Sequence, residues 1–291
     1  AAGRRGRGSL MPVSDLHRRV AAVALTAARE HGFALGGGNA LLAYGVISRP
    51  TQDVDLFTDQ EHGVEAAAGA VEAALRHAGF EAERQDQVAG LDDLFPGMGE
   101  GLAEWVVTAP GGAQMMLQLA YFDRGCHPVV MDIGPVLDLE DVVGGKVCAL
   151  ASRVEPRDYA DVAAALERYT PMQLIGFARR LDPGLTAQDF AEAGLRLDEM
   201  DDRAFAEIGL GPADVTALRE RLSAWPRSPE AADREPGPGN PSEHQAAPGH
   251  TPAVGRPGPD IQEAEPADRR QQQLGPEPAA QTERDDLEAE P

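Results

Sequence analysis

The chain has few cysteines and no long apolar run. Cys126 and Cys148 are its only cysteines, and they show neither zinc-site spacing nor a disulfide framework. No segment approaches the apolar length that spans a bilayer, and the N-terminal residues lack the apolar core of a secretory signal. We therefore expect a soluble, cytoplasmic protein with no membrane partner.

Basic residues are also scarce. The 291 residues include 26 lysines and arginines against 48 acids, which gives a net charge of −22 at pH 7. This charge argues against broad, non-specific binding to nucleic acid, although it is compatible with a local basic pocket.

The two ends of the chain differ in composition from the middle. Residues 228–291 are rich in proline and acids and nearly devoid of aromatic and β-branched residues. Such a segment cannot bury enough apolar surface to offset its conformational entropy, so we expect a disordered acidic tail. Residues 1–12 are rich in glycine and arginine and are also expected to be disordered, either as an upstream extension before Met11 or as a basic arm that contacts RNA.

The middle of the chain divides into two parts. Residues 13–136 mix helical and strand periodicities, with helices expected near 14–30, 39–44 and 64–77 and strands near 33–35, 53–57, 80–85, 104–108 and 114–121. Residues 137–227 are helical, with helices expected near 139–152, 157–168, 171–181, 186–197 and 211–224. Because strands and helices do not alternate regularly, the order predicts an α+β fold with an α/β core and a helical subdomain.

Two aspartates give the first candidate site. Asp53 and Asp55 are two apart on a predicted strand, so both carboxylates project from one face. Two negative charges this close are costly unless a cation lies between them. Carboxylates completed by triphosphate oxygens and water suit Mg²⁺. We therefore predict that Asp53 and Asp55 bind Mg²⁺ and are catalytic.

A run of three glycines precedes this strand, at the point where a shorter strand gives way to a helix. Backbone N–H groups and the positive end of a helix can hold phosphate there. Either feature alone is weak, since Asp-x-Asp occurs on solvated strands and glycine clusters form turns; together they are more specific. The residues predicted to bind the nucleotide here are Gly36, Gly37, Gly38, Asn39, Arg49 and Thr51.

A second group of charged residues lies on two predicted helices. Lys146 and Arg153 fall at helical spacing and can share one side of a helix. We predict that Lys146 is catalytic and neutralises the triphosphate with Arg153 and Arg157, while Asp158 either deprotonates the acceptor or orients a basic partner. The alternative is an ion-pair network of Arg153, Arg157, Asp158 and Asp161 that locks the two helices together.

These blocks resemble those of the AbiEii/AbiGii toxin family of nucleotidyltransferases. The resemblance rests on residues 36–40 (GGGNA), 49–56 (RPTQDVDL) and 139–161 (LEDVVGGKVCALASRVEPRDYAD), and it extends from about Ser14 to Pro226. It implies a polymerase-β-like fold with a mixed sheet flanked by helices. It also implies a growth-blocking toxin that often modifies tRNA and is opposed by a separately encoded antitoxin.

One position departs from that pattern. Polymerase-β-like enzymes commonly place a third carboxylate on a later strand, where relatives of this family often read Asp-Leu-Ala, but this chain reads Gln118-Leu119-Ala120. Gln118 offers a carbonyl oxygen without charge or basicity. Asp123 is not expected to replace the carboxylate, since a shift of five residues points to the other strand face.

The sequence thus favours a Mg²⁺-dependent enzyme that moves a nucleoside monophosphate from an NTP to an acceptor, with tRNA as the expected acceptor. Two alternatives stay open. Gln118 motivates a catalytically silent NTP-binding or interaction module. The acidic surface would suit a nucleotidyltransferase acting on a cationic small molecule such as an aminoglycoside.

Overall fold

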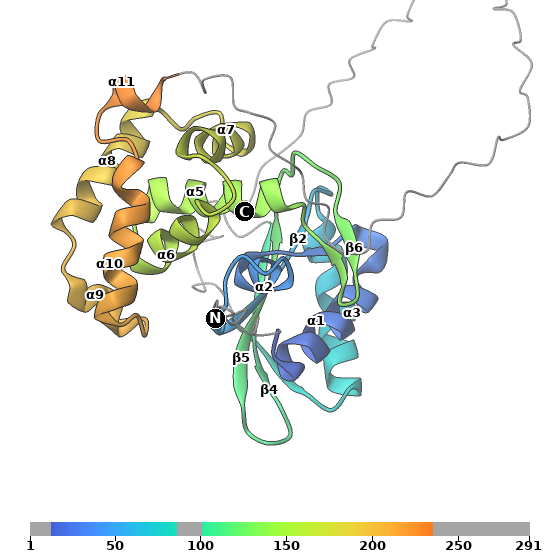
Figure 1. Cartoon of the computed structure of the whole chain (residues 1–291). Coiled ribbons are helices and arrows are strands. Elements are labelled where there is room, and N and C mark those ends of the chain that lie inside the picture. The colour runs from blue at the N-terminus through green and yellow to red at the C-terminus, as the bar shows by residue number, and fades with distance from the viewer. Residues whose placement is uncertain (1–12, 86–100, 235–291) are drawn as a thin grey trace, which may run out of the picture. The chain divides into compact units, whose positions relative to one another are not determined.

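The computed structural model describes residues 13–85 and 101–234 (Figure 1). The predicted N-terminal extension and residues 235–291 of the predicted tail lie outside the described residues.

Seven strands of the described residues form one mixed sheet in the order β3-β4-β5-β2-β1-β7-β6. They are β1 (Ala34–Leu35), β2 (Asp53–Thr58), β3 (Glu81–Gln85), β4 (Leu102–Thr108), β5 (Gln114–Tyr121), β6 (Val129–Met131) and β7 (Gly134–Val136). β3, β4 and β5 are antiparallel neighbours, whereas β2 runs parallel to β5 and antiparallel to β1. β2, which carries both predicted catalytic aspartates, is thus the central strand.

Helices cover the sheet and then build a second, helical part of the fold. They are α1 (Asp15–Ala27), α2 (Gly37–Ala43), α3 (Gly63–His77), α5 (Leu139–Arg153), α6 (Pro156–Ala165), α7 (Pro171–Leu181), α8 (Ala187–Glu199), α9 (Asp202–Glu207), α10 (Pro212–Arg221) and α11 (Pro229–Ala232). Two 3₁₀ turns, η1 (Arg29–His31) and η2 (Leu222–Ala224), complete the described elements.

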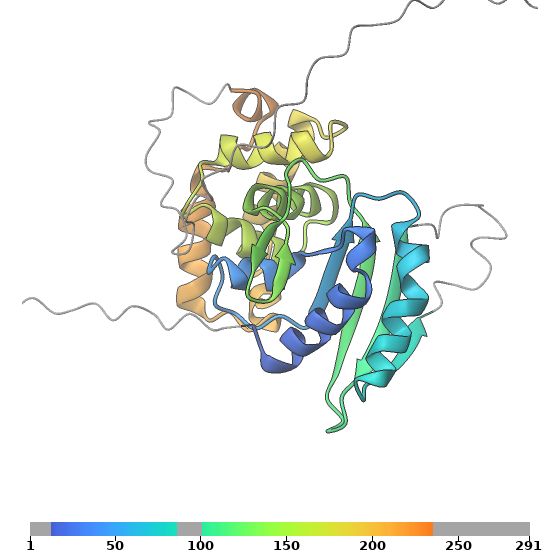
Figure 2. The ribbon, with the colours of Figure 1, turned by 90° about the vertical axis from the view of Figure 1, so that its right-hand side faces the viewer.

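The two faces of the sheet differ in burial at β2. Val54, Leu56 and Thr58 of β2 are buried on the face against which α1 and α3 pack side by side (Figure 2). Successive side chains of a strand point to opposite faces, so Asp53 and Asp55 face the other way. One face of β2 therefore builds the core and the other carries the site.

The helical part has its own buried contacts. α5 packs on α6, α7 and α8. Trp225 is buried and donates its indole N–H to the carbonyl oxygen of Phe190 over 3.0 Å. α7 and α8 each begin with a capping box, at Thr170 and Thr186, which satisfies backbone N–H groups in the first turn.

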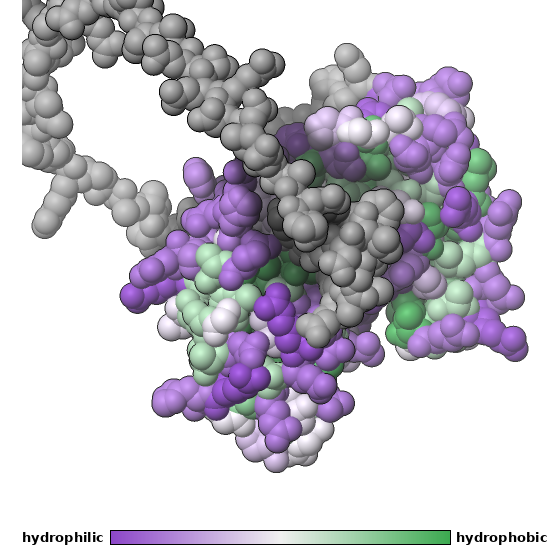
Figure 3. Space-filling model, turned by 180° about the vertical axis from the view of Figure 1, so that it is seen from behind, coloured by the Kyte–Doolittle hydropathy of each residue, from purple (hydrophilic) through white to green (hydrophobic). Residues whose placement is uncertain are grey.

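The surface of the described residues is mostly hydrophilic, and Figure 3 shows small apolar patches between polar side chains on the face seen from behind. The exposed large apolar side chains come from separate elements and are Tyr121, Val130, Leu195 and Ile208. None of the helices within residues 13–85 and 101–234 is long and apolar enough to cross a membrane.

The predicted α+β class and the predicted helices and strands of residues 14–85, 104–121 and 139–224 are confirmed, with shifts of a few residues at their ends. β6 and β7 escaped prediction because each has three residues, and Pro135 interrupts a strand pattern. α9, with six residues, was likewise too short for periodicity to detect.

One predicted boundary was placed too early. The tail was expected to begin at residue 228, but Ser228 caps the short helix α11, whose Ala232 is buried, and α11 packs against α8. Asp233 also pairs with Arg179 over 2.6 Å. A short apolar contact and one ion pair therefore hold a segment whose composition alone indicates disorder.

Candidate active site

Asp53 and Asp55 lie on the same, more open face of β2, as the sequence predicts. Both side chains are half-buried. Among the ion pairs of the described residues, none involves either carboxylate; the cations of α5 and α6 pair with other acids. The site thus contains two neighbouring carboxylates without a direct cationic partner in that part of the chain.

The three glycines allow the chain to approach β2 closely. A Cβ atom on Gly37, whose φ is +57°, would lie 1.7 Å from Oδ2 of Asp55. A Cβ on Gly36 would lie 2.4 Å from the ring of Phe57, and one on Gly38 would lie 2.4 Å from Cγ2 of Thr51. Each glycine therefore meets a different part of the loop and strand that carry the aspartates. The phosphate-binding role of this segment stays a prediction.

Asn39 and Thr51 connect α2 to the start of β2. The buried Asn39 amide donates to the carbonyl oxygen of Asp53 over 2.6 Å, and the Thr51 hydroxyl donates to the Asn39 side-chain oxygen over 2.9 Å. Both residues were predicted to bind the nucleotide. In the structure their side chains position the backbone at Asp53.

Asp161 connects the motif at residues 49–56 with the motif at residues 139–161. Its fully buried carboxylate pairs with Arg49 over 2.6 Å and with Lys146 over 3.0 Å. The predicted network is therefore right that an ion pair of Asp161 joins the two helices, and wrong about its partners, which are Arg49 and Lys146. The reason is tertiary, because the loop before β2 meets α6 at this point and supplies an arginine from 112 residues away.

Asp158 has a different partner. Nε and Nη2 of Arg153 each donate to one of its oxygens over 2.8 Å, and its side chain is fully buried. This pair of the predicted network is confirmed. Arg157 instead pairs with Glu155 over 2.7 Å, and both of those side chains are half exposed. Because both Asp158 oxygens accept from Arg153, the structure favours an orienting role for Asp158; its role as a base stays a prediction.

Charges from β2, α5 and α6 shift the pKa of the Asp55 carboxyl. Burial raises the pKa of the Asp55 carboxyl above its ordinary value, and the nearby charge of Asp53 raises it further. Lys146 opposes both effects, as do Arg157 and Arg153 to a smaller extent. Asp55 thus carries an electrostatic cost that a bound cation would relieve.

Gln118 lies beside this pair, on the neighbouring strand. It is the register partner of Asp55 on β5, and Glu104 on β4 is in turn the partner of Gln118. The amide nitrogen of Gln118 donates to Oε1 of Glu104 over 2.9 Å. Sequence reasoning identified Gln118 and missed Glu104, although counting residue pairs back from the hairpin turn at 109–113 could have found it.

The protein supplies few ligands for a metal ion at this site. Within residues 13–85 and 101–234, no group of three or more histidines, cysteines, aspartates or glutamates is arranged to hold one. Asp53 and Asp55 are thus a two-carboxylate arrangement, which suits an ion that takes its other ligands from phosphate and water.

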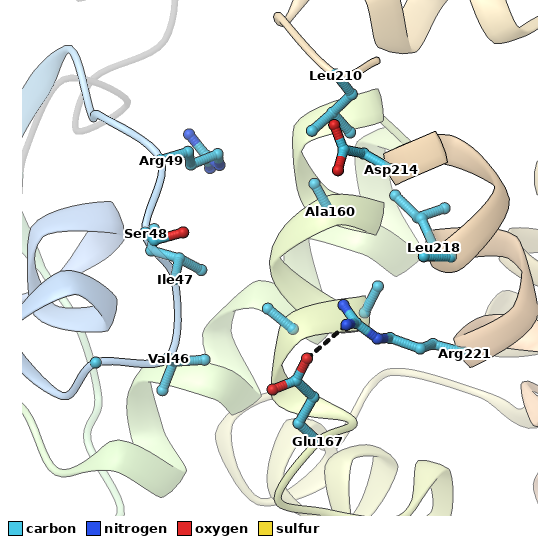
Figure 4. A pocket seen from close by; sticks show the side chains of 14 residues that line it. Val46, Ile47, Ser48, Arg49, Ala160, Glu167, Leu210, Asp214, Leu218 and Arg221 are labelled. Carbon is cyan, nitrogen blue, oxygen red and sulfur yellow. Dashed lines mark ion pairs between the residues drawn. The ribbon is translucent and has the colours of Figure 1, made fainter. Parts of the chain in front are cut away.

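A cavity of about 430 Å³ lies between the loop at residues 45–49 and helices α6 and α10 (Figure 4). Ala160 and Leu218 help to line it, and an ion pair of 2.6 Å joins Arg221 to Glu167. Of the predicted site residues, Arg49 alone is among the described residues that line it. The cavity is therefore adjacent to the Asp161 pairs and distinct from the carboxylates of β2.

Comparison with known proteins identifies the family. The profile of a family described as the nucleotidyl transferase AbiEii toxin of type IV toxin–antitoxin systems matches residues 20–234, more than half of the chain. No curated protein sequence matches the chain.

Solved structures resemble the chain distantly. An H. pylori protein provisionally assigned as a nucleotidyltransferase is 14% identical, with a TM-score of 0.49 over 72% of this chain and 94% of that one. JHP933 from Helicobacter pylori is 13% identical, with a TM-score of 0.46 over 72% and 92%. The nucleotidyltransferase toxin MenT4 from Mycobacterium tuberculosis is 14% identical, with a TM-score of 0.46 over 72% and 82%. Similarities at this level add nothing to the family match.

The matched region begins within α1 and ends just after α11, so it includes the glycine segment, both aspartates of β2 and the ion pairs of α5 and α6. Membership implies an NTP as substrate and an antitoxin as partner. The chain belongs to the AbiEii family of nucleotidyltransferase toxins, the enzymes of type IV toxin–antitoxin systems.

Proposed function

We propose that this nucleotidyltransferase moves a nucleoside monophosphate from an NTP to tRNA, with Mg²⁺ held by Asp53 and Asp55. The observation that carries the proposal is the environment of the two carboxylates. They share one face of β2 and lack an ion-pair partner among the described residues, and the Gly37 backbone packs directly against Asp55.

The residues present fit a magnesium ion. Mg²⁺ typically binds through one or two carboxylates and keeps several waters or substrate phosphates as its other ligands. Burial and the charge of Asp53 raise the pKa of Asp55, which indicates that a cation there would be stabilising. When bound, the ion would neutralise charge on the transferring phosphate.

The chain's own residues would bind and orient the nucleotide. Gly36, Gly37 and Gly38 let the backbone approach β2 closely, so that its N–H groups could hold phosphate oxygens near the carboxylates. The charges of Lys146, Arg157 and Arg153 lower the pKa of Asp55, and the same charges would favour a triphosphate bound beside it. Positioning and fixed charge would supply most of the rate acceleration.

The proposed reaction is an in-line displacement. A hydroxyl oxygen of the acceptor forms a bond to the α-phosphorus, the bond from that phosphorus to the bridging oxygen breaks, and pyrophosphate leaves. The hydroxyl proton passes to a base. For Asp158 to accept it, the bidentate pair with Arg153 would have to open.

The choice of tRNA as acceptor rests on the resemblance to the family. The net charge of −22 disfavours non-specific contact with RNA. Local contact is compatible with the side chains of Arg153 and Arg157, which are about half exposed.

Gln118 favours a second candidate, a catalytically silent NTP-binding module. It is the register partner of Asp55, where a third carboxylate would be expected, and its amide is neutral. Such a module would bind the nucleotide with Mg²⁺ and would not turn it over.

Transfer of label tests the proposal. The wild-type protein and an Asp53→Asn/Asp55→Asn variant are incubated with each α-³²P NTP and Mg²⁺, together with purified tRNA or cell lysate. The proposal predicts label on tRNA that depends on both carboxylates and on Mg²⁺. Label on a small molecule or protein would retain the chemistry and replace the acceptor. Nucleotide binding without any transfer by the folded wild-type protein would favour the silent module.

A further inference from the structure

Three strands place a row of polar side chains beside the proposed metal site. Asp55 on β2, Gln118 on β5 and Glu104 on β4 are consecutive register partners. All three lie at the half-buried positions of strands whose intervening residues are buried in the core. The row therefore runs across the open face of the sheet, and Glu104 is its far member.

The hydrogen bond between Glu104 and Gln118 can run in one direction only, from the Gln118 amide nitrogen to the Glu104 carboxylate. A carboxylate only accepts hydrogen bonds, whereas an amide has one end that donates and one that accepts. The amide nitrogen of Gln118 donates to Oε1 of Glu104 over 2.9 Å. The carbonyl oxygen of Gln118 belongs to the other branch of the amide, and the negative charge of Glu104 disfavours its turning toward β4.

We infer that Glu104 is a positioning residue, which holds the Gln118 amide so that its carbonyl oxygen serves the metal–nucleotide site at Asp55. This inference rests on the proposed function. Gln118 would supply a neutral oxygen where a third carboxylate is expected, either to the metal ion or to one of its waters. Glu104 would supply the missing negative charge from about 10 Å away, the width of two strand spacings.

A mainly structural role for the contact makes a different prediction. A half-buried hydrogen bond across the β4–β5 hairpin would stabilise the fold and leave the affinity for metal unchanged. The two roles can therefore be separated by measuring metal affinity and stability on the same variants.

The main test is the isosteric variant Glu104→Gln, titrated with Mn²⁺ as the probe by calorimetry. Its amide can both donate and accept, so it no longer fixes the orientation of Gln118. Loss of a side chain that orients a metal ligand typically weakens binding by about 10- to 100-fold. We expect the Kd for Mn²⁺ to rise at least about tenfold, while the melting temperature changes little.

The matched control is Glu83→Gln. Glu83 is exposed on β3 and pairs in register with Val106, so it lies on the same face of the sheet as Glu104 and has the same charge. It forms no side-chain contact with Gln118 among the described residues. Its loss should leave the Kd for Mn²⁺ near the wild-type value, which separates positioning from a general loss of negative charge.

An exchange variant sharpens the test. Gln118→Glu combined with Glu104→Gln retains one donor and one acceptor in the pair, and it moves the carboxylate next to Asp55. We expect it to bind Mn²⁺ at least as tightly as the wild-type protein. Weaker binding by this folded variant would contradict the inferred orientation.

The two proposals fail in distinguishable ways. Wild-type protein that binds no Mn²⁺, or an Asp53→Asn/Asp55→Asn variant that binds it normally, overturns the metal site and the inference with it. Loss of binding in that variant, with a wild-type Kd for Glu104→Gln, overturns the inference alone. A change confined to the melting temperature of Glu104→Gln assigns the contact a structural role.

Discussion

Two pairs of aspartates have opposite environments in this protein. Asp158 and Asp161 on α6 are fully buried, and each is paired with arginine or lysine. Asp53 and Asp55 on β2 are half-buried and form no ion pair within the described residues. One pair is already neutralised by the protein, whereas the other remains available to an external cation.

The difference shows how one residue type serves structure and chemistry in adjacent elements. Buried carboxylates require a partner because desolvation of an isolated charge is costly. The partners of Asp161 come from both the loop before β2 and α5, so this carboxylate joins the sheet to the helical part. A carboxylate left without such a partner, beside backbone that approaches as closely as Gly37, is what the proposed metal site requires.

The largest expected effect on stability comes from the paired aspartates. Asp161→Ala would leave Arg49 and Lys146, which are 29% and 17% exposed, without their shared partner. We expect a loss of about 3–5 kcal/mol in the free energy of unfolding, measured by urea denaturation. Asp233→Ala, which removes an exposed pair with Arg179, serves as the control and should cost below about 1 kcal/mol. A similarly small loss for Asp161→Ala would show that its buried ion pairs contribute no more to stability than an exposed pair does.

Gly37→Ala tests the close approach to Asp55. The new Cβ would lie 1.7 Å from Oδ2 of Asp55, so the carboxylate or the glycine segment must move. A displacement of about 1 Å can lower turnover by about 100-fold, and we expect a loss of that order in nucleotidyl transfer. Gly69→Ala on α3 is the control, because nothing lies within 4 Å of its Cβ. That control should raise stability by about 0.5–1 kcal/mol and leave transfer unchanged.

Asp55→Asn tests the unpaired carboxylate through pH. Burial raises the pKa of Asp55 in the folded protein above its unfolded value. At a pH between those two pKa values the folded state binds more protons than the unfolded state. The contribution of Asp55 to stability therefore falls as the pH rises through this window. In EDTA at neutral pH, Asp55→Asn should therefore melt above the wild-type protein, and its melting temperature should depend less on pH. The control is Asp123→Asn, because Asp123 is exposed and its substitution should change neither the melting temperature nor its pH dependence. A lower melting temperature for Asp55→Asn would show that the protein compensates the charge of Asp55.

The smallest expected effect on stability comes from Arg157→Ala. Arg157 and Glu155 form a pair whose side chains are 47% and 41% exposed, so its loss should change the free energy of unfolding by below about 0.5 kcal/mol. If Arg157 binds the nucleotide, the KM for NTP should nevertheless rise several-fold. Arg29→Ala, which removes an exposed pair with Glu30, should leave KM unchanged. An unchanged KM for Arg157→Ala would remove Arg157 from the site.

Much of the fold follows from local patterns. The alternation around Asp53 and Asp55 predicts a strand with one buried face, and β2 has that face in the structure. β6, β7 and α9 were not predicted because each is too short to show a period. Periodicity also gives no strand order, so the central position of β2 could not be read from it.

The candidate site was predictable residue by residue, but of its contacts only the Arg153–Asp158 pair was predicted correctly. The spacing of Asp53 and Asp55 gave a shared face, and Lys146 with Arg153 gave a shared helix side. Asn39 and Thr51 were predicted as nucleotide ligands, but they hydrogen-bond to each other and to the backbone of Asp53. Polar residues near a predicted phosphate site suit both tasks equally well, and sequence spacing does not distinguish them.

The sequence by itself determined the types of the longer helices and strands, the motifs at 36–56 and 139–161, and the pair of carboxylates, because each depends on spacing within a few residues. Only the tertiary structure decided which charges meet: Arg49 reaches Asp161 across 112 residues, and Glu104 reaches Gln118 through the register of a hairpin. Ion-pair and hydrogen-bond partners are selected by distance in space, because the attraction between two charges falls as their separation grows.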